Sequence, residues 1–303
     1  MTPEQISRWT EDFKAESNGA FLMNNWIPEP SPARDRQHED ALRAFLSKFG
    51  REVSEGAADA QQISFDEQCE AMLDSRPSVI SSIMGLYTPE FVSQMKNLGT
   101  RWFATVTSVS EAIAAEQAGA DALVVQGVEA GGHRGNFLTD FEQSAGLMAL
   151  LPVIDDAVQT PLIATGGIAD SRGISAAIML GASAVQIGTG LLRTPEASIA
   201  SAWADSLHDT RPEDTIITAS FSGKPGRAIK NRYINAAHDK NNPAPAPYPV
   251  QRSLTQAMRS HATLSNDIDT MQAWAGQAAS LAEQRAARDL LSNLWAGVEK
   301  IFN

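Results

Sequence analysis

The stretch that decides the fold is Gln126-Gly127-Val128-Glu129-Ala130-Gly131-Gly132-His133-Arg134-Gly135, which directly follows a short apolar run at 122–125. Glycines let a backbone adopt positive φ and pass close to a ligand. An imidazole can transfer a proton near neutral pH. Because parallel α/β enzymes place catalytic residues in the loops after their strands, this stretch predicts a catalytic loop with His133 as the proton-transferring residue.

Short apolar runs recur on both sides of this loop, and helix signals fill the gaps between them. Ser108 with Glu111 reads as a capping box, Asp170 as a helix N-cap, and Gly119 and Gly181 as helix ends. Apolar runs without alternation are typical of strands covered on both faces. The chain therefore predicts strands of a parallel sheet at 21–24, 78–84, 102–106, 122–125, 161–165 and 184–187.

The pattern changes after residue 193. A turn-rich segment follows, with a stiff proline-rich connector at 243–249. Helices are expected at 254–258 and again over 268–298. We predict a barrel-like domain at 1–193, completed by helices that return at 271–303, and an appended smaller lobe at 194–270.

Two glycine-rich turns suggest a site for a phosphate. Gly166 and Gly167 lie between a predicted strand and a helix, and Gly188 and Thr189 follow the next strand. Consecutive turns of this kind can direct backbone N–H groups at one anion, and a helix N-terminus adds its dipole. Barrel enzymes often bind phosphate after their last two strands. Tight turns without a ligand remain the alternative.

Composition restricts the class of protein. The chain has 303 residues, 43% of them hydrophobic, and a formal net charge of −12. This charge disfavours nucleic acid and anionic membranes as partners, and the apolar runs are shorter than the roughly 20 residues of a membrane helix. The lone Cys69 forms no internal disulfide and fits a reducing cytoplasm. The sequence contains no Cys/His cluster, so it does not predict a zinc site.

Several motifs in order resemble the nitronate monooxygenase family, formerly called 2-nitropropane dioxygenases. The motifs are QGVEAGGHRG, ATGGIADSRG, VQIGTGLL, MNNWIP, SSIMG, FSGKPGR and WAGQ, and they span nearly the whole chain. The family resemblance implies an α/β, TIM-barrel-like (β/α)₈ flavoprotein with FMN as its cofactor, and makes 1–193 with 271–303 the FMN-binding domain.

The resemblance also implies a role for individual positions. His133 matches the family's active-site histidine beside the flavin, and Gln277 is expected to return to the cofactor region. The implied contacts to the flavin ring are Asn24, Gln126, Gly131 and Gly132, and those to its phosphate are Gly166, Gly167, Gly188 and Thr189.

Other polar and aromatic residues receive plainer interpretations. Arg134 either holds an anionic substrate or is solvated, and Glu129 caps nearby N–H groups. Lys224 and Arg227 are expected mainly to serve solubility, and a minor structural role in the lobe is the alternative because their turn resembles a family segment. The remaining residues are given no chemistry: helix packing for Trp274 and Trp295, and surface or core positions for His38, His208, His238 and His261.

One departure from the family pattern stands out. The family opens with two strands that have no counterpart here, so about six of the eight strands of a closed barrel are found. A barrel without these two strands is open and has two unpaired sheet edges. We therefore expect reduced FMN affinity or reduced stability. The cause is left open among a truncated gene, a misplaced start codon and a partial chain.

The resemblance implies oxidation of alkyl nitronates or nitroalkanes by dioxygen to carbonyl compounds and nitrite. An FMN- and NADH-dependent enoyl-acyl-carrier-protein reductase, which shares a similar GGH loop, is the second interpretation. A truncated, cofactor-free remnant is the non-enzymatic one. The expected partners are a small-molecule nitronate and dioxygen, and a homo-oligomer is left open.

Overall fold

A parallel sheet of six strands organises the molecule. The computed structural model describes residues 1–50, 52–59 and 63–303, and in this part of the chain the sheet has the order β1-β2-β3-β4-β6-β7. All six predicted strands are confirmed. They are β1 Leu22–Trp26, β2 Val79–Ile83, β3 Arg101–Val106, β4 Ala122–Gln126, β6 Leu162–Thr165 and β7 Ala184–Gln186.

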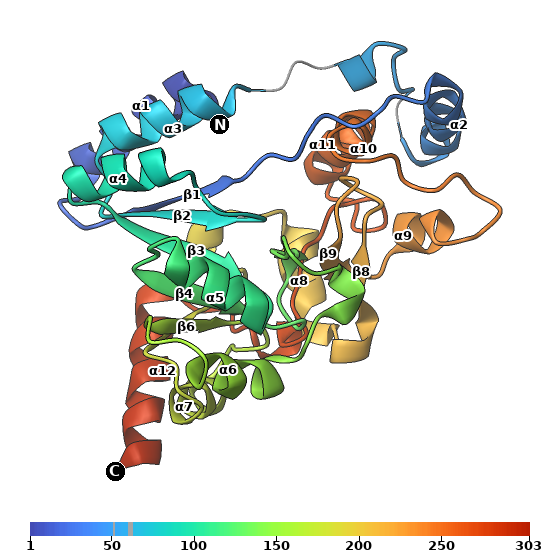
Figure 1. Cartoon of the computed structure of the whole chain (residues 1–303). Coiled ribbons are helices and arrows are strands. Elements are labelled where there is room, and N and C mark those ends of the chain that lie inside the picture. Colours follow the sequence, from blue (N-terminus) through green and yellow to red (C-terminus); the bar gives the residue numbers. More distant parts are fainter. Residues whose placement is uncertain (51, 60–62) are drawn as a thin grey trace.

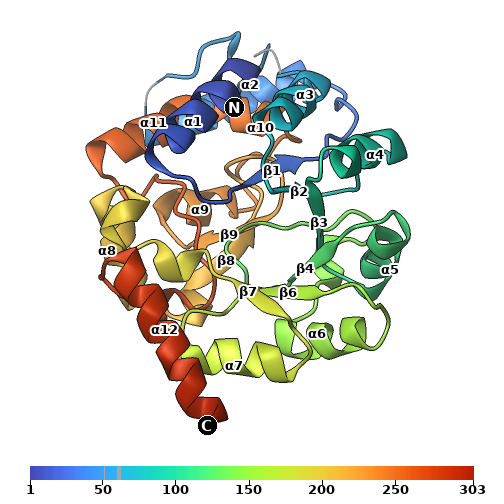
Figure 2. The same ribbon diagram turned by 90° about the vertical axis from the view of Figure 1, so that its left-hand side faces the viewer.

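Helices connect these strands on the outer side of the sheet. Figure 2 shows the strands following one another in an arc, with α4, α5, α6 and α7 outside it. Each strand pairs with the next of the six along the chain, as parallel crossover connections require. The helices of this region are α1 Pro3–Glu16, α3 Phe65–Ser75, α4 Pro89–Asn97, α5 Val109–Gln117, α6 Leu147–Asp155, α7 Ser171–Met179 and α12 Ala287–Phe302.

The predicted helix caps are confirmed in part. Asp170 Oδ1 accepts hydrogen bonds from the N–H groups of Arg172 (3.0 Å) and Gly173 (3.1 Å) at the start of α7. Ser108 Oγ accepts from the N–H of Glu111 (3.3 Å). The second half of that capping box is wrong, because the Glu111 carboxylate accepts from the N–H groups of Thr107 and of the loop that follows His133 instead.

A small antiparallel sheet lies beside the parallel one. Its order is β5-β9-β8, from β5 Gly132–His133, β9 Gly226–Ile229 and β8 Thr215–Thr218. His133 pairs with Gly226. The loop after β4 therefore leaves the parallel sheet and is held by a strand from much later in the chain. The neighbouring helices are α8 Ser201–Asp209, α9 Arg232–Ala237, α10 Val250–Leu254 and α11 Gln256–Ser265.

An early helix joins this second region. α2 (Arg36–Leu46) contacts α10, and Figure 1 shows it on the same side of the molecule as α9, α10 and α11. Its Leu42 and Phe45 pack in one buried cluster with Phe221 and Tyr233. The boundary at residues 193 and 194 stays a prediction, and residues well before it contribute to the core of the lobe.

The expectation of a helix over 268–298 is wrong for most of that span. α11 ends at Asn266, which has a left-handed conformation, and α12 begins only at Ala287. Between them the backbone is mostly irregular, and Trp274 forms a β-bridge with Ala228 instead of packing within a helix. Trp295 lies on α12 but is 58% exposed, so its predicted packing role is also wrong.

The two edges of the parallel sheet are β1 and β7, which do not pair with each other in the described part of the chain.

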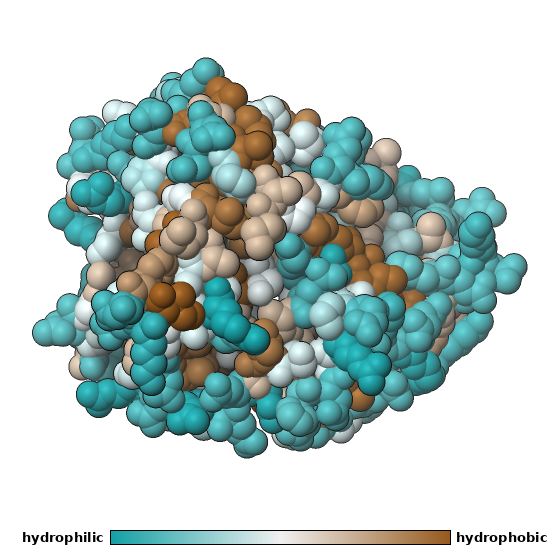
Figure 3. All heavy atoms as spheres, turned by 90° about the horizontal axis from the view of Figure 1, so that it is seen from below, coloured by the Kyte–Doolittle hydropathy of each residue, from teal (hydrophilic) through white to brown (hydrophobic). Residues whose placement is uncertain are grey.

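Figure 3 shows apolar side chains gathered toward the middle of one face and hydrophilic ones at its rim. Exposed apolar residues include Met179 on α7 and Leu291 and Trp295 on α12. These two helices pack against each other.

Candidate active site

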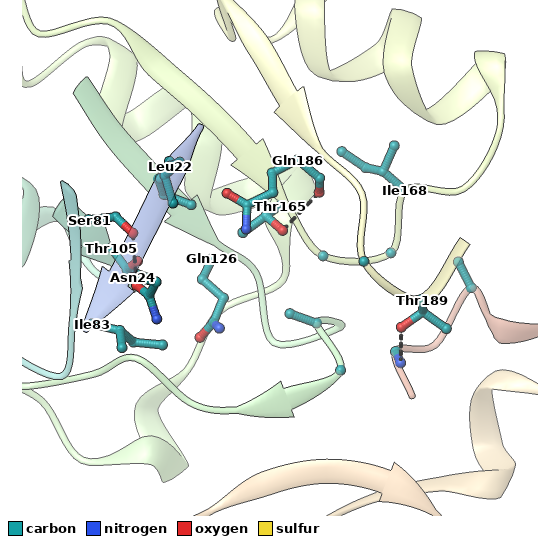
Figure 4. Close-up of a pocket in the computed structure, with 18 residues that line it drawn as sticks. Leu22, Asn24, Ser81, Ile83, Thr105, Gln126, Thr165, Ile168, Gln186 and Thr189 are labelled. Atoms are coloured by element: carbon teal, nitrogen blue, oxygen red, sulfur yellow. Dashed lines mark hydrogen bonds between the residues drawn. The ribbon is translucent and has the colours of Figure 1, made fainter. Parts of the chain in front are cut away.

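A cavity of about 280 Å³ opens where the parallel strands end (Figure 4). Its wall combines side chains of the strands with backbone of the loops after them. Seven of the nine predicted site residues line it: Asn24, Gln126, Gly131, Gly166, Gly167, Gly188 and Thr189. Gly132 and His133 are not among its lining residues, so their predicted roles beside the flavin stay predictions.

The two glycine turns face the cavity with free hydrogen-bond donors. Within residues 1–50, 52–59 and 63–303, the backbone N–H groups of Gly166, Gly167, Gly188 and Thr189 donate no hydrogen bond. The Thr189 hydroxyl accepts from the N–H of Gly276 (2.9 Å) and keeps its own proton to donate. Unpaired N–H groups beside the start of α7 are suited to a phosphate dianion.

The opposite wall carries amide side chains. Asn24 Oδ1 accepts from the Ser81 hydroxyl (2.8 Å), which leaves the Asn24 amide N–H groups directed toward a ligand site (Figure 4). Gln126 donates to the carbonyl of His133 (3.1 Å) and accepts from the N–H of Gly135 (2.9 Å). The Gln126 amide therefore holds the catalytic loop in shape while it lines the cavity.

Gly131 sits where three separate segments meet. A Cβ at this position would lie 2.5 Å from the backbone nitrogen of Gly276 and 2.9 Å from Thr189 Oγ1. No side chain fits at that distance, so glycine is required by packing alone. Gly276 and Ala278, which also line the cavity, return here from the C-terminal segment.

His133 lies beside the cavity in an aromatic enclosure. Its ring packs edge-on against Trp26 (4.6 Å between centroids) and Trp274 (4.9 Å), and Nε2 lies 2.7 Å from Ser222 Oγ. Burial, aided by the positive charges of Arg252, Lys224 and Arg259, lowers the pKa of His133 to about 4. The imidazole is therefore neutral at pH 7 and able to accept a proton.

Two buried arginines shape the loop, which contradicts the interpretations of Arg134 and the solubility role of Arg227. Arg134 is 2% exposed and donates to the carbonyls of Gly127 (2.7 Å) and Gln126 (3.3 Å). Arg227, also buried, donates to the carbonyl of Val128 (3.0 Å). Together they bind three consecutive carbonyls that start at the last residue of β4, so they hold the loop, and the structural alternative for Arg227 is favoured.

The predictions for Glu129, Lys224 and the WAGQ segment have different outcomes. Glu129 accepts from the N–H of Leu147 at the start of α6 (2.9 and 3.1 Å). Its predicted capping role is confirmed, but this N–H is not local, because Leu147 lies 18 residues further along the chain. Lys224 is 13% exposed and pairs with Glu29 (2.5 Å), so solubility as its main role is wrong and the structural alternative is favoured. The WAGQ segment reaches the cavity as predicted, with the Gln277 N–H donating to the carbonyl of Glu129 (2.9 Å).

The sequence interpretation gives no catalytic or binding role to four residues of the site: Trp26, Ser222, Trp274 and Gly276. Trp26, Ser222 and Trp274 contact His133 from β1, from the turn before β9 and from the C-terminal segment. All four lie in motifs that resemble the family, which is the signal that could have found them. No local pattern places them together, because they are far apart in the chain.

Parallel strands that end in glycine turns with unpaired N–H groups, next to a half-buried neutral imidazole, are typical of cofactor-dependent α/β enzymes. The family model described as nitronate monooxygenase matches residues 1–297, and the chain belongs to this family. It is 34% identical over 293 residues to a probable nitronate monooxygenase of Staphylococcus aureus (strain Newman), which covers 94% of this chain and 81% of the relative.

Solved structures agree with this assignment. The nitroalkane oxidase from Streptomyces ansochromogenes superposes with a TM-score of 0.90 at 30% identity, over 99% of this chain and 86% of that one. FabK from Thermotoga maritima has a TM-score of 0.76 at 22% identity, over 100% and 83% of the two chains, and shows the shared fold.

The class of protein follows from these similarities. The fold is that of the TIM-barrel flavoenzymes, and the chain is a flavin-dependent oxidoreductase of a family that oxidises nitronates or nitroalkanes. Its substrates are small molecules. In the described ranges, no helix combines the length and the apolar character needed to cross a membrane.

Proposed function

We propose that the chain oxidises alkyl nitronates and their parent nitroalkanes with FMN as cofactor and dioxygen as electron acceptor, producing a carbonyl compound and nitrite. The observation that carries this proposal is the neutral, half-buried His133 in a glycine-rich loop that lines the cavity with Gln126, Ala130 and Gly131. A nitroalkane must lose its α-proton before it is oxidised as a nitronate, and a neutral imidazole is the base for that step.

The cradle supports FMN as the flavin. The N–H groups of Gly166, Gly167, Gly188 and Thr189 form one cluster at one end of the cavity, which suits a single terminal phosphate. The Asn24 amide lies on the opposite wall, where it can donate to a polar edge of the ring. Bound FMN would supply the electron-accepting chemistry. Side chains and backbone groups of this chain would fix the position of the cofactor.

The surroundings of His133 support its role as the base. Trp26 and Trp274 pack edge-on against the ring and shield part of it from water. The nearby charges of Lys224, Arg252 and Arg259 attract an anionic nitronate while keeping the imidazole neutral. The α-proton of a neutral nitroalkane would pass to His133, and the nitronate would be left for oxidation.

The test begins with the visible spectrum of the purified protein. A flavin spectrum whose chromophore is released as FMN, bleached by an alkyl nitronate without oxygen and restored with nitrite release by oxygen, is the expected result. Reduction by NADH with turnover of a crotonyl thioester, and no response to nitronate, would instead support the enoyl reductase. Absence of flavin even after FMN is added would support a cofactor-free remnant.

Two further properties belong to the proposal. The exposed apolar residues of α7 and α12, Met179, Leu291 and Trp295, support a homo-oligomer, which sedimentation of the purified protein tests. The buried Cys69, whose pKa burial raises to about 12, supports a location in a reducing cytoplasm.

A further inference from the structure

A buried serine lies in contact with His133 on the side of the lobe. Ser222 is completely buried in the turn between β8 and β9, and its Oγ lies 2.7 Å from His133 Nε2. The same oxygen lies 3.2 Å from the carbonyl of Lys224 and 3.3 Å from the N–H of Lys224. The hydroxyl thus has three fixed neighbours in a site closed to solvent.

The neighbours of Ser222 restrict the directions in which its proton can point. The Lys224 carbonyl can only accept a hydrogen bond and the Lys224 N–H can only donate one. When the hydroxyl donates to the carbonyl, its oxygen remains as an acceptor for the N–H and for His133. His133 must then carry its proton on Nε2, because the hydrogen bond made by one ring nitrogen sets the tautomer of the other.

The second ring nitrogen of His133 is in a different situation. Nδ1 makes no hydrogen bond with any residue of the described chain, and it is not among the buried atoms that lack a partner there, Arg134 Nε, Ser144 Oγ, Ser175 Oγ and Trp203 Nε1. It therefore keeps contact with open space. In the tautomer that Ser222 favours, this atom carries a lone pair.

We propose that Ser222 is a positioning residue that holds the proton of His133 on Nε2 and leaves Nδ1 as the atom that accepts the α-proton of the substrate. This inference rests on the proposed function. In the step, the C–H bond breaks, its electron pair stays with the nitronate, and the proton binds Nδ1. Nε2–H goes on donating to Ser222 throughout, so the hydrogen-bonded chain to Lys224 needs no rearrangement.

Nuclear magnetic resonance of the protein labelled with ¹⁵N-histidine tests the tautomer directly. The chain has five histidines, and His133→Asn identifies the signal of His133 by its loss. The expected spectrum at pH 7 shows His133 protonated on Nε2, both in the flavin-loaded protein and after flavin removal. A spectrum with the proton on Nδ1 would overturn the proposal.

Substitution of the serine tests its effect, with a neighbouring serine as control. Ser222→Ala removes the hydroxyl, and we expect a mixed tautomer together with a 10- to 100-fold lower kcat/KM for a neutral nitroalkane, about the loss seen for outer partners of ligating histidines. Oxidation of a preformed nitronate, which needs no base, should fall much less. Ser220→Ala removes a hydroxyl that is equally buried but pairs with Thr218, and should change neither tautomer nor rate.

The readouts separate the failure of this inference from failure of the proposed function. If Ser222→Ala keeps the wild-type tautomer and rate, the positioning role is wrong even when His133→Asn abolishes turnover. If His133→Asn retains nitroalkane turnover, the proposed function fails instead. Equal losses with nitroalkane and nitronate in Ser222→Ala would mean that Ser222 supports the site as a whole, which also contradicts the proposal.

Discussion

The two sheets of this molecule divide the work of the candidate site. The parallel sheet provides β1, β4 and the turns after β6 and β7, and with them most of the cavity wall. The small antiparallel sheet provides His133, which lies on β5, and its turn before β9 provides Ser222. Under the proposed function, the first region would hold the cofactor and the second would present a base to the substrate.

This division predicts which property a substitution in each sheet should change. Changes in the turns of the parallel sheet should weaken cofactor binding and leave the chemistry of the bound enzyme intact. Changes at the antiparallel sheet should leave the cofactor bound and slow proton transfer. Four experiments examine that separation.

The largest effect is expected for His133→Asn. Asparagine keeps a polar side chain of similar reach but cannot accept the α-proton, and a positioned general base is worth about 10²–10⁴ in rate. Nitroalkane turnover should fall by that factor while FMN stays bound, as measured by oxygen consumption and flavin absorbance. Loss of FMN in this variant would show that the two sheets do not act separately.

Acid should destabilise the protein through the same residue. The pKa of His133 is about 4 in the folded chain against 6.5 in the ordinary state, so the unfolded chain binds a proton first as pH falls. The contribution is fully present above pH 6.5 and is lost between pH 6.5 and 4, by up to about 3 kcal/mol. Denaturant unfolding at pH 7 and pH 5 should show a smaller pH dependence in His133→Asn. Identical pH dependence in both proteins would contradict the burial of the ring.

Glu111→Gln should lower stability without touching the cofactor. The Glu111 carboxylate accepts from the N–H groups of Thr107 (2.7 Å), Phe137 (2.7 Å) and Leu138 (3.0 Å), using both oxygens. A glutamine places its own N–H₂ against one set of these donors, which costs about 2 kcal/mol. Thermal unfolding measures the loss. An unchanged free energy of unfolding would mean that the loop after His133 does not depend on this anchor.

The smallest effect is expected at Gly188. A Cβ there meets no atom within 4 Å and the backbone φ is −102°, so Gly188→Ala should fold normally. The added methyl group projects from the cradle, and we expect FMN to bind about tenfold more weakly, or about 1.4 kcal/mol. Titration of the flavin-free protein measures this, with Gly56→Ala, another position with open space, as control. Equal affinities would place the phosphate elsewhere.

The sequence predicts the parallel sheet far better than the antiparallel one. A strand that is buried on both faces has an uninterrupted apolar run in its sequence, which can be recognised locally. All six such runs are strands. β5 has only two residues, Gly132 and His133, and exists because it pairs with β9. No window around His133 contains that information, so the sequence shows the histidine but not Ser222 or the two tryptophans that enclose it.

The charged residues show the same limit. The capping role of Glu129 is correctly predicted, but the N–H that it binds belongs to Leu147, 18 residues further along the chain. Arg134 and Arg227 look like surface residues because arginine usually is one. Their guanidinium groups are buried only because the loop folds back so that backbone carbonyls can accept from them. A prediction of that kind needs the path of the chain, which comes from the resemblance to relatives and not from composition.

The contact of Gly131 with Gly276 and Thr189 sets the moment at which the enzyme can acquire its flavin. The cavity wall draws on residues from Leu22 to Ala278, so it can close only after the chain has been synthesised as far as Ala278. Because a ligand stabilises only a state that binds it, we expect the flavin to stabilise the folded protein without assisting the early stages of folding.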